Sequence, residues 1–253
     1  MKGLNESGAA TRDKVIIALD EPVFGAARET VESLGGDAVF YKVGAGLFAA
    51  AGWRVIEYLK ENGKKVFLDL KFHDIPNSVA AAGRAVVVLG VDMFTVHLSG
   101  GAAMVAACRR AVDAAADAAG APPPAMLGVT VLTSVGERTL REETLCDVPI
   151  PRLVVHYAEL GRSAGADGVV ASPLEAALVR KYHPEDFMIV TPGVRPAWAA
   201  RNDQERTLSP AEAFARGATH IVVGRPVTTA PDPSAALKKL FGEIAGGRGE
   251  RTP

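Results

Sequence analysis

Short apolar runs alternate along the chain with longer, alanine-rich stretches of helical periodicity. The apolar runs are almost continuously hydrophobic, which is typical of parallel strands that are covered on both faces. We expect eight strands: Val15–Leu19, Ala38–Val43, Lys65–Leu70, Met93–His97, Met126–Leu132, Gly168–Ala171, Phe187–Val190 and Thr219–Val223. The stretches between them predict helices, among them Ala26–Leu34, Trp53–Asn62, Ser78–Leu89 and Ala102–Ala116.

Eight β–α units in one chain favour a closed (β/α)8 barrel of the TIM type, an α/β fold that forms a single domain. An open, doubly wound sheet is the alternative, but no glycine-rich nucleotide fingerprint follows the first strand. We expect the barrel domain to span residues 13–244, between flexible tails at 1–12 and 245–253. The longest connection, 133–166, should hold helical pieces near Glu137–Thr144 and Leu153–Ala164.

Composition narrows the possible partners. Hydrophobic residues make up 48% of the chain and the formal net charge is −1, so neither nucleic acid nor an anionic membrane is an expected partner. The polar start and the lack of a long apolar stretch argue against a signal peptide and a membrane span. Cys108 and Cys146 lie far apart and are expected to be reduced thiols. We therefore expect a cytoplasmic protein.

Polar side chains stand where most of these strands end, and in a (β/α)8 barrel the chemistry is located at the carboxyl ends of the strands. A charge at the end of a buried strand is costly unless it is paired. The strand-end candidates are Asp20, Lys42, Asp69, Lys71, His97, Thr133, Ser134, Thr191 to Arg195, and Gly224 with Arg225. We expect them to converge on one pocket.

The third strand is the most informative of these. Asp69 and Lys71 are two residues apart and should share one face. Lys42 on the neighbouring strand and Asp74 on the following loop would complete an alternating Lys–Asp–Lys–Asp array, in which each carboxylate favours the charged form of its lysine. A proton donor beside a fixed negative charge suits a reaction that forms a carbanion and then protonates it. For Asp69 and Lys71 alone, a structural ion pair at the barrel rim is the alternative.

The last two strands indicate a phosphate site. Gly224 permits close backbone approach, Arg225 offers a bidentate guanidinium, and Pro226 suits the first turn of a helix. Together with the Thr191–Arg195 segment they predict an anion pocket after strands seven and eight, with a plain loop as the alternative. The polar stretch from Arg195 to Arg206 is expected to act as a lid.

Two histidines lie close to these residues. We expect His97 to have a structural or hydrogen-bonding role, with a catalytic base as the alternative, and His73 to be supportive as well. No His, Asp or Glu cluster has the spacing of a metal site, so the site is predicted to be free of metal.

The segment from Asp69 to Pro76 closely resembles the D-x-K-x-x-D-I-P signature of the orotidine 5′-monophosphate decarboxylases. The resemblance extends over roughly residues 14–240. Its other motifs follow in the order of that family: Ile17–Asp20, Lys42–Gly44, Val131–Ser134, Asp167–Ser172, Thr191–Arg195, Asn202–Gln204 and Val222–Pro226.

The resemblance implies roles for individual residues. Those that match the catalytic tetrad of the family are Lys42, Asp69, Lys71 and Asp74. Those that match substrate contacts are Asp20 at the ribose, Thr133 near the pyrimidine, Arg195, Gly224 and Arg225 at the phosphate, and Gln204 on the lid, bridging phosphate and base. In the family the second aspartate of the signature enters the partner's active site, so Asp74, Ile75 and Ser78 would complete the neighbouring pocket of a homodimer.

The implied reaction is decarboxylation of orotidine 5′-phosphate to UMP and carbon dioxide without a cofactor, the last step of de novo pyrimidine biosynthesis. Asp69 would crowd the departing carboxylate, while Lys71 would stabilise and protonate C6. One alternative is a magnesium-dependent sugar-phosphate decarboxylase or synthase of the same suprafamily, which typically has an acidic residue where this chain has Lys42 and Gly44. The other alternative is a phosphate-binding barrel without activity.

Overall fold

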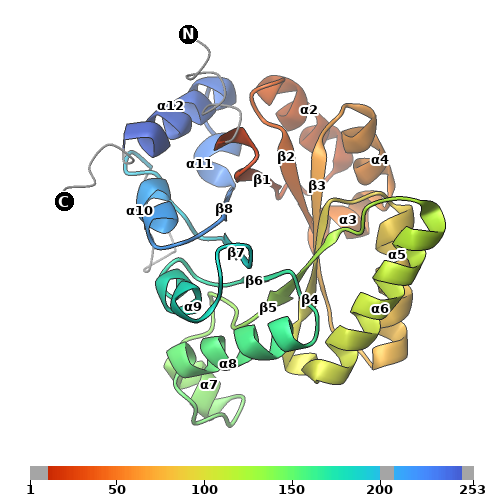
Figure 1. The fold of residues 1–253 in the computed structure, drawn as a ribbon. Helices are drawn as coiled ribbons and strands as arrows, with labels where there is room; N and C mark the ends of the chain where they lie inside the picture. Colours follow the sequence, from red (N-terminus) through yellow and green to blue (C-terminus); the bar gives the residue numbers. More distant parts are fainter. Residues whose placement is uncertain (1–10, 200–207, 247–253) are drawn as a thin grey trace.

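Eight parallel strands close into a barrel in the computed structural model, which describes residues 11–199 and 208–246. Each strand pairs with the next along the chain, and β8 pairs with β1 (Figure 1). The strands are β1 (Val15–Leu19), β2 (Phe40–Gly44), β3 (Lys65–Phe72), β4 (Met93–His97), β5 (Ala125–Val129), β6 (Gly168–Val170), β7 (Met188–Thr191) and β8 (His220–Val223). The predicted (β/α)8 barrel is thereby confirmed.

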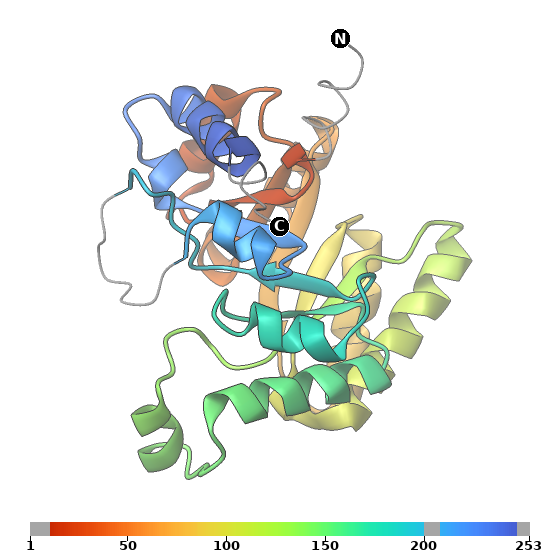
Figure 2. The same ribbon diagram turned by 60° about the vertical axis from the view of Figure 1, so that its left-hand side comes forward.

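Helices surround the barrel on its outside, and α5 packs against α6 along one side (Figures 1 and 2). They are α2 (Phe24–Leu34), α3 (Ala45–Ala51), α4 (Arg54–Glu61), α5 (Pro76–Val88), α6 (Gly101–Ala119), α7 (Glu137–Glu142), α8 (Ile150–Ser163), α9 (Ala176–Tyr182), α10 (Pro210–Ala215), α11 (Arg225–Thr228) and α12 (Pro233–Gly246). A 3-10 turn, η1 (Leu98–Gly100), links β4 to α6. No helix in the described part of the chain is long and apolar enough to cross a membrane.

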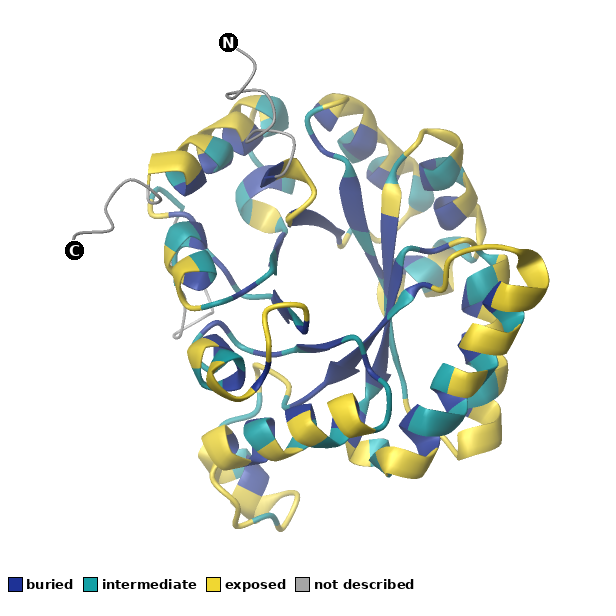
Figure 3. Ribbon diagram, viewed as in Figure 1, coloured by how far each residue is buried: buried dark blue, intermediate teal, exposed yellow. Residues whose placement is uncertain are grey.

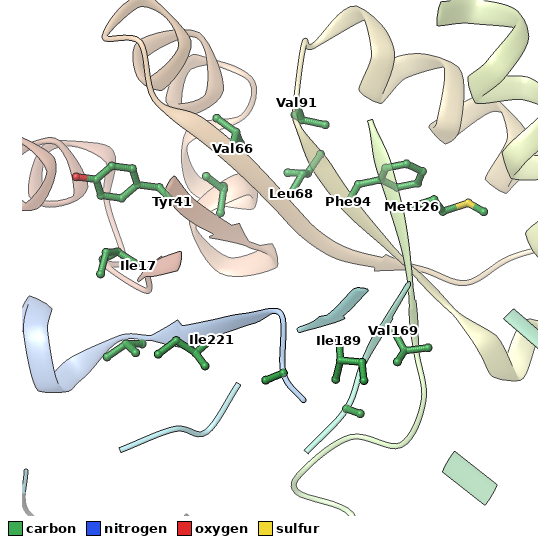
Figure 4. Packing of buried hydrophobic residues seen from close by; sticks show 14 of the residues in the cluster. Ile17, Tyr41, Val66, Leu68, Val91, Phe94, Met126, Val169, Ile189 and Ile221 are labelled. Carbon is green, nitrogen blue, oxygen red and sulfur yellow. The ribbon is translucent and has the colours of Figure 1, made fainter. Parts of the chain in front are cut away.

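Alternation along each strand divides the core into two layers. Residues that point outward pack under the helices, and Figure 4 labels several of them, including Ile17, Tyr41 and Ile221. Their inward-pointing neighbours fill the inside of the barrel with a second cluster: Ile16, Ala18, Phe40, Phe67, Met93, Leu127, Val190 and Val222. Figure 3 shows that the strands and the helix faces toward the barrel are buried, whereas the outer helix faces are exposed.

β1 and β4 have the predicted bounds, and the other six strands differ from them, most of all at the carboxyl ends of β3 and β5. β3 continues to Phe72, and its register with β4 shifts between Leu68 and Phe72. β5 ends at Val129, three residues before the predicted end at Leu132. The backbone N–H and the hydroxyl of Thr130 both still donate to Val170 O, at 3.2 and 2.9 Å, and a turn then follows in which Val135 N donates to Leu132 O.

The long connection after β5 contains the two predicted helical pieces. α7 and α8 match them within a few residues, and α7 lies outside α8, farther from the barrel axis (Figures 1 and 2). The predicted tails lie largely outside the described residues, although α12 continues to Gly246.

Candidate active site

The carboxyl ends of the first three strands bring four charged side chains into one row. Lys42 Nζ lies 3.3 Å from Asp20 Oδ1 and 4.0 Å from Asp69 Oδ2, and Lys71 Nζ lies 2.9 Å from the same Asp69 oxygen. Acidic and basic groups therefore alternate as Asp20, Lys42, Asp69 and Lys71. The side chains of Lys42 and Asp69 are only 13% and 14% exposed, so solvent screens the centre of the row least.

The backbone of β3 brings Asp69 and Lys71 together in a way that regular alternation does not describe. Lys71 has a φ of +52°, which is uncommon for a residue other than glycine, and it lies inside the register shift of β3. Its backbone N–H donates to Thr95 Oγ1 at 2.9 Å. The surrounding structure thus holds Lys71 in a sparsely populated conformation, as is common at functional sites.

Thr95 is a site residue that the sequence reasoning missed. Besides accepting from Lys71 N, its hydroxyl donates to Asp69 Oδ1 at 3.0 Å, and the residue is fully buried. The available signal was a polar residue in the otherwise apolar strand Met93–His97, spaced by two from the inward-pointing Met93. Thr95 fixes one oxygen of Asp69 and leaves the other to the two lysines.

A cavity of about 490 Å³ opens beside this row, a size that suits a small ligand. It is lined from β1, β2 and β3, from the loop after β1 and from the first turn of α3, by Leu19, Asp20, Glu21, Pro22, Lys42, Gly44, Ala45, Gly46, Leu47, Asp69, Leu70 and Lys71. Gly44 lies close to this row, since a Cβ at that position would be 3.1 Å from Lys42 Nζ. The row of charges thus forms one wall of a pocket at the barrel mouth.

Asp74 lies outside the row within a single chain. It is exposed on the loop between β3 and α5, where its Oδ1 accepts from Ile75 N at 2.6 Å. Every residue from His73 to Ser78 is exposed, and Ile75 is 66% exposed despite its apolar side chain. The structure thus brings together three of the four predicted catalytic residues and places Asp74, Ile75 and Ser78 on the surface.

The predicted phosphate residues flank the row on the side of β8. Gly224 precedes α11, and a Cβ on it would lie 3.4 Å from Asp20 Oδ2, so the ends of β8 and β1 are close neighbours. Arg225 is the first residue of α11. Arg195 is half-buried after β7, and its backbone N–H donates to Leu208 O at 3.0 Å, which ties together the two ends of the 196–207 segment. Gln204 lies outside the described residues.

Thr133 does not directly follow a strand, because β5 ends earlier than predicted. It is exposed in the turn-rich segment before α7. Its place near a pyrimidine therefore stays a prediction.

His97 and His73 lie beside Lys71 as a stacked pair, with ring centroids 5.3 Å apart. Burial lowers the pKa of His97, and the neighbouring His73 and Lys71 lower it further. In the described residues, no group of three or more His, Cys, Asp or Glu side chains is arranged to hold a metal ion. The chemical resources of this site are thus lysine ammonium groups, carboxylates and imidazoles.

A closed parallel barrel with a row of lysines and aspartates at its carboxyl end defines a (β/α)8-barrel enzyme. Residues 13–240 match the model of the orotidine 5′-phosphate decarboxylase / HUMPS family, and the chain belongs to this family.

Individual relatives agree with that assignment. The chain is 48% identical over 233 residues to the orotidine 5′-phosphate decarboxylase of Moorella thermoacetica, covering 92% of each chain. It is 50% identical over 235 residues to that of Alkalilimnicola ehrlichii, covering 93% of this chain and 97% of the relative. The crystal structure of orotidine 5′-phosphate decarboxylase from Lactobacillus acidophilus superposes with a TM-score of 0.81 at 40% identity, covering 91% of this chain and 98% of that one.

Proposed function

We propose that the pocket at the barrel mouth decarboxylates orotidine 5′-phosphate to UMP and carbon dioxide, with Lys71 as the proton donor and without a cofactor. The observation that carries this proposal is the row of Asp20, Lys42, Asp69 and Lys71, in which Lys71 Nζ lies 2.9 Å from Asp69 Oδ2. The relatives that match over nearly the whole chain bear the name of this activity. The substrate would place its carboxylate and C6 beside this pair.

The reaction breaks the bond between C6 and its carboxylate and leaves the electron pair on C6. Asp69 disfavours the bound substrate, because its fixed negative charge faces the carboxylate, and this repulsion ends as neutral carbon dioxide forms. The ammonium of Lys71 stabilises the charge that develops on C6 and then donates its proton there. Lys42, between Asp20 and Asp69, holds both carboxylates in place through its single positive charge.

Asp74 would complete the tetrad from the other subunit of a homodimer. Its exposure, together with that of Ile75 and Ser78, supports this assignment, since a charged and an apolar side chain stand side by side on the surface. In the dimer, Asp74 would lie near Lys71 of the neighbouring site. The enzyme would then have two sites, each built from two chains.

The rest of the substrate would extend from the row toward β8. Asp20 would accept from the ribose hydroxyls, since it lies between Lys42 and the Gly224 backbone. Arg195, Gly224 and Arg225 would hold the phosphate, Gln204 would bridge phosphate and base, and Thr133 would lie near the pyrimidine. Binding energy from the distant phosphate would then be used at C6. A small phosphorylated nucleotide as substrate is consistent with a cytoplasmic enzyme that binds no nucleic acid.

One assay, run in buffer with and without a chelator, tests the activity against both alternatives. The absorbance of the orotate ring is followed after the enzyme is mixed with orotidine 5′-phosphate in buffer that contains a chelator. We expect its loss at a rate proportional to enzyme. A rate that the chelator abolishes would favour the magnesium-dependent alternative, and no turnover in either buffer would favour a silent barrel.

A mixing experiment tests the shared site. Lys71→Ala and Asp74→Asn are each expected to be inactive, but a hybrid dimer of the two contains one site with no substitution. Random exchange of subunits should restore about a quarter of the wild-type activity, because half of the dimers are hybrids with one intact site out of two. If each site were built from one chain, mixing would restore nothing.

A further inference from the structure

Two histidines join the ends of β3 and β4 next to the catalytic row, and the proposed reaction does not use them. The rings of His73 and His97 stack with centroids 5.3 Å apart and planes inclined by 21°. His97 is the last residue of β4, on the same inward face as Thr95, and His73 directly follows β3. The stack therefore joins the end of β4 to the first residue of the loop that carries Asp74.

The segment that follows β4 contacts both rings of this pair. Ser99 Oγ lies 2.7 Å from His97 Nδ1 and fixes the orientation of that ring. Gly100 leaves room for the other ring, because a Cβ there would lie 3.1 Å from His73 Cδ2 and would collide with Met104 Sδ. Both rings are thus held by groups outside the β3–α5 loop.

The loop between β3 and α5 is not anchored by buried side chains of its own. No residue from His73 to Ser78 is buried, whereas Val79 on the first turn of α5 is. Apolar burial therefore fixes the loop only at Val79 and beyond. The His73 ring is next to Asp74 in sequence, so its position restricts the backbone of Asp74 directly.

We infer that His97 is a positioning residue: its ring, oriented by Ser99, supports the ring of His73 and so holds Asp74 where the partner subunit's site requires it. This inference rests on the proposed function, because the position of Asp74 matters for the rate only if the active site is shared between subunits.

A proton on His97 would weaken the stack, because the charged ring would be repelled by the nearby ammonium of Lys71. The titratable groups that face His97 are His73 and Lys71, both at the end of β3. On η1 it meets Ser99, and on β5 it pairs with Val129, neither of which is charged. Burial, His73 and Lys71 together lower the pKa of His97 below its ordinary value of 6.5. The ring is therefore neutral at pH 7 and takes up a proton only at a pH below 6.5, where we expect the loop to loosen.

Two substitutions separate support by the ring from imidazole chemistry. His97→Ala removes the stack, and misplacing a reacting group by about 1 Å costs up to about 100-fold in rate. We therefore expect its kcat at pH 7.5 to fall about 10- to 100-fold. His97→Phe keeps a ring that stacks and cannot be protonated, so it should restore most of the rate at pH 7.5. Relative to wild type, it should become more active wherever acid protonates the His97 ring of the wild type, which happens at a pH below 6.5.

Controls make each outcome decisive. His156→Ala removes an exposed histidine on α8 and should have no effect on the rate or its pH profile. Unchanged kcat in His97→Ala would overturn the inference, and so would a His97→Phe variant as slow as His97→Ala. If His97→Ala does not fold, the rate of His97→Phe at pH 7.5 decides, because a loss of more than about tenfold with the stacking ring retained contradicts the inference. Asp74→Asn, measured alongside, separates the two levels: full activity in that variant refutes the shared site itself, whereas an inactive Asp74→Asn with a fully active His97→Ala refutes only the role of His97.

Discussion

The two ends of the barrel interior are built from the same strands and yet differ completely in chemistry. Phe40 and Phe67 belong to the apolar cluster toward the amino ends of β2 and β3. Two residues farther along the same inward faces stand Lys42 and Asp69, which belong to the row of charges. On each strand, two residues along the same inward face therefore separate the packed core from the catalytic surface.

This difference shows how stability and activity are divided in the fold. The apolar cluster toward the amino ends of the strands, called the lower cluster below, stabilises the fold through apolar burial. It includes side chains that are almost completely excluded from water. The row of charges at the carboxyl ends places like charges near one another, because Lys42 and Lys71 share one oxygen of Asp69. Such an arrangement adds little net stability. A substitution in the apolar cluster should therefore lower stability more than rate. A substitution in the row of charges should lower rate more than stability.

The largest effect on rate among residues next to Lys71 is expected for Asp69→Asn. The amide keeps the size of the side chain but removes the charge that faces both lysines and the substrate carboxylate. We expect kcat at saturating orotidine 5′-phosphate to fall about 1000-fold. A variant that keeps a tenth of the wild-type rate would break the division between the two ends.

Phe67→Ala, two residues earlier on the same face, should show the opposite pattern. It leaves a cavity in the lower cluster and should lower the free energy of unfolding by about 3–5 kcal/mol. The kcat of the folded fraction should fall far less than in Asp69→Asn. Urea denaturation and kcat measured at the same temperature test both points. Equal losses of rate in the two variants would show that the lower cluster is part of the catalytic machinery.

Arg225→Ala sharpens the comparison by removing a charge at the mouth that is remote from C6. Loss of a charge-assisted contact of about 1.5–3 kcal/mol should raise KM for orotidine 5′-phosphate about 10- to 100-fold. Arg152→Ala is the matched control, since it removes an exposed arginine on α8 that has no role in the proposed site. Steady-state kinetics of both variants measure the effect. An unchanged KM in Arg225→Ala would contradict the phosphate role.

The smallest effect concerns His220 at the lower end, where burial lowers the pKa to about 4, assisted by Lys14 and Lys65. The folded state thus binds this proton more weakly than the unfolded state, whose histidine titrates near 6.5. Stability is fully present above pH 6.5 and is lost as the pH falls from there toward 4, by up to about 2 kcal/mol at pH 5.

The measurement for His220 is the free energy of unfolding at pH 7 and pH 5. His220→Gln should lose less stability than wild type over this interval, while His156→Gln on the surface of α8 should behave as wild type. Parallel losses in wild type and His220→Gln would show that His220 does not cause the acid sensitivity.

The sequence predicted the architecture well because parallel strands that are buried on both faces stand out as apolar runs. β1 and β4 have the predicted bounds, and the row of Lys42, Asp69 and Lys71 lies where strand ends predicted it. The resemblance to the family added roles that spacing alone did not contain.

Other features depend on contacts between strands and were not visible in one strand's pattern. The left-handed backbone of Lys71 depends on Thr95 of the next strand, and so does one hydrogen bond of Asp69. The early end of β5 moved Thr133 away from the strand end, because turn hydrogen bonds replaced the ladder. The stack of His73 on His97 likewise joins residues of two strands. Local pattern predicts elements, whereas these details require the closed barrel.

The most direct test of the central claim is the turnover of Lys71→Ala with orotidine 5′-phosphate, measured on protein whose urea unfolding matches that of wild type. The proposed role of Lys71 predicts loss of at least about 10⁴-fold in kcat, since the variant lacks both the charge beside C6 and the proton that C6 receives. A folded variant with a rate within about tenfold of wild type would contradict the proposed mechanism.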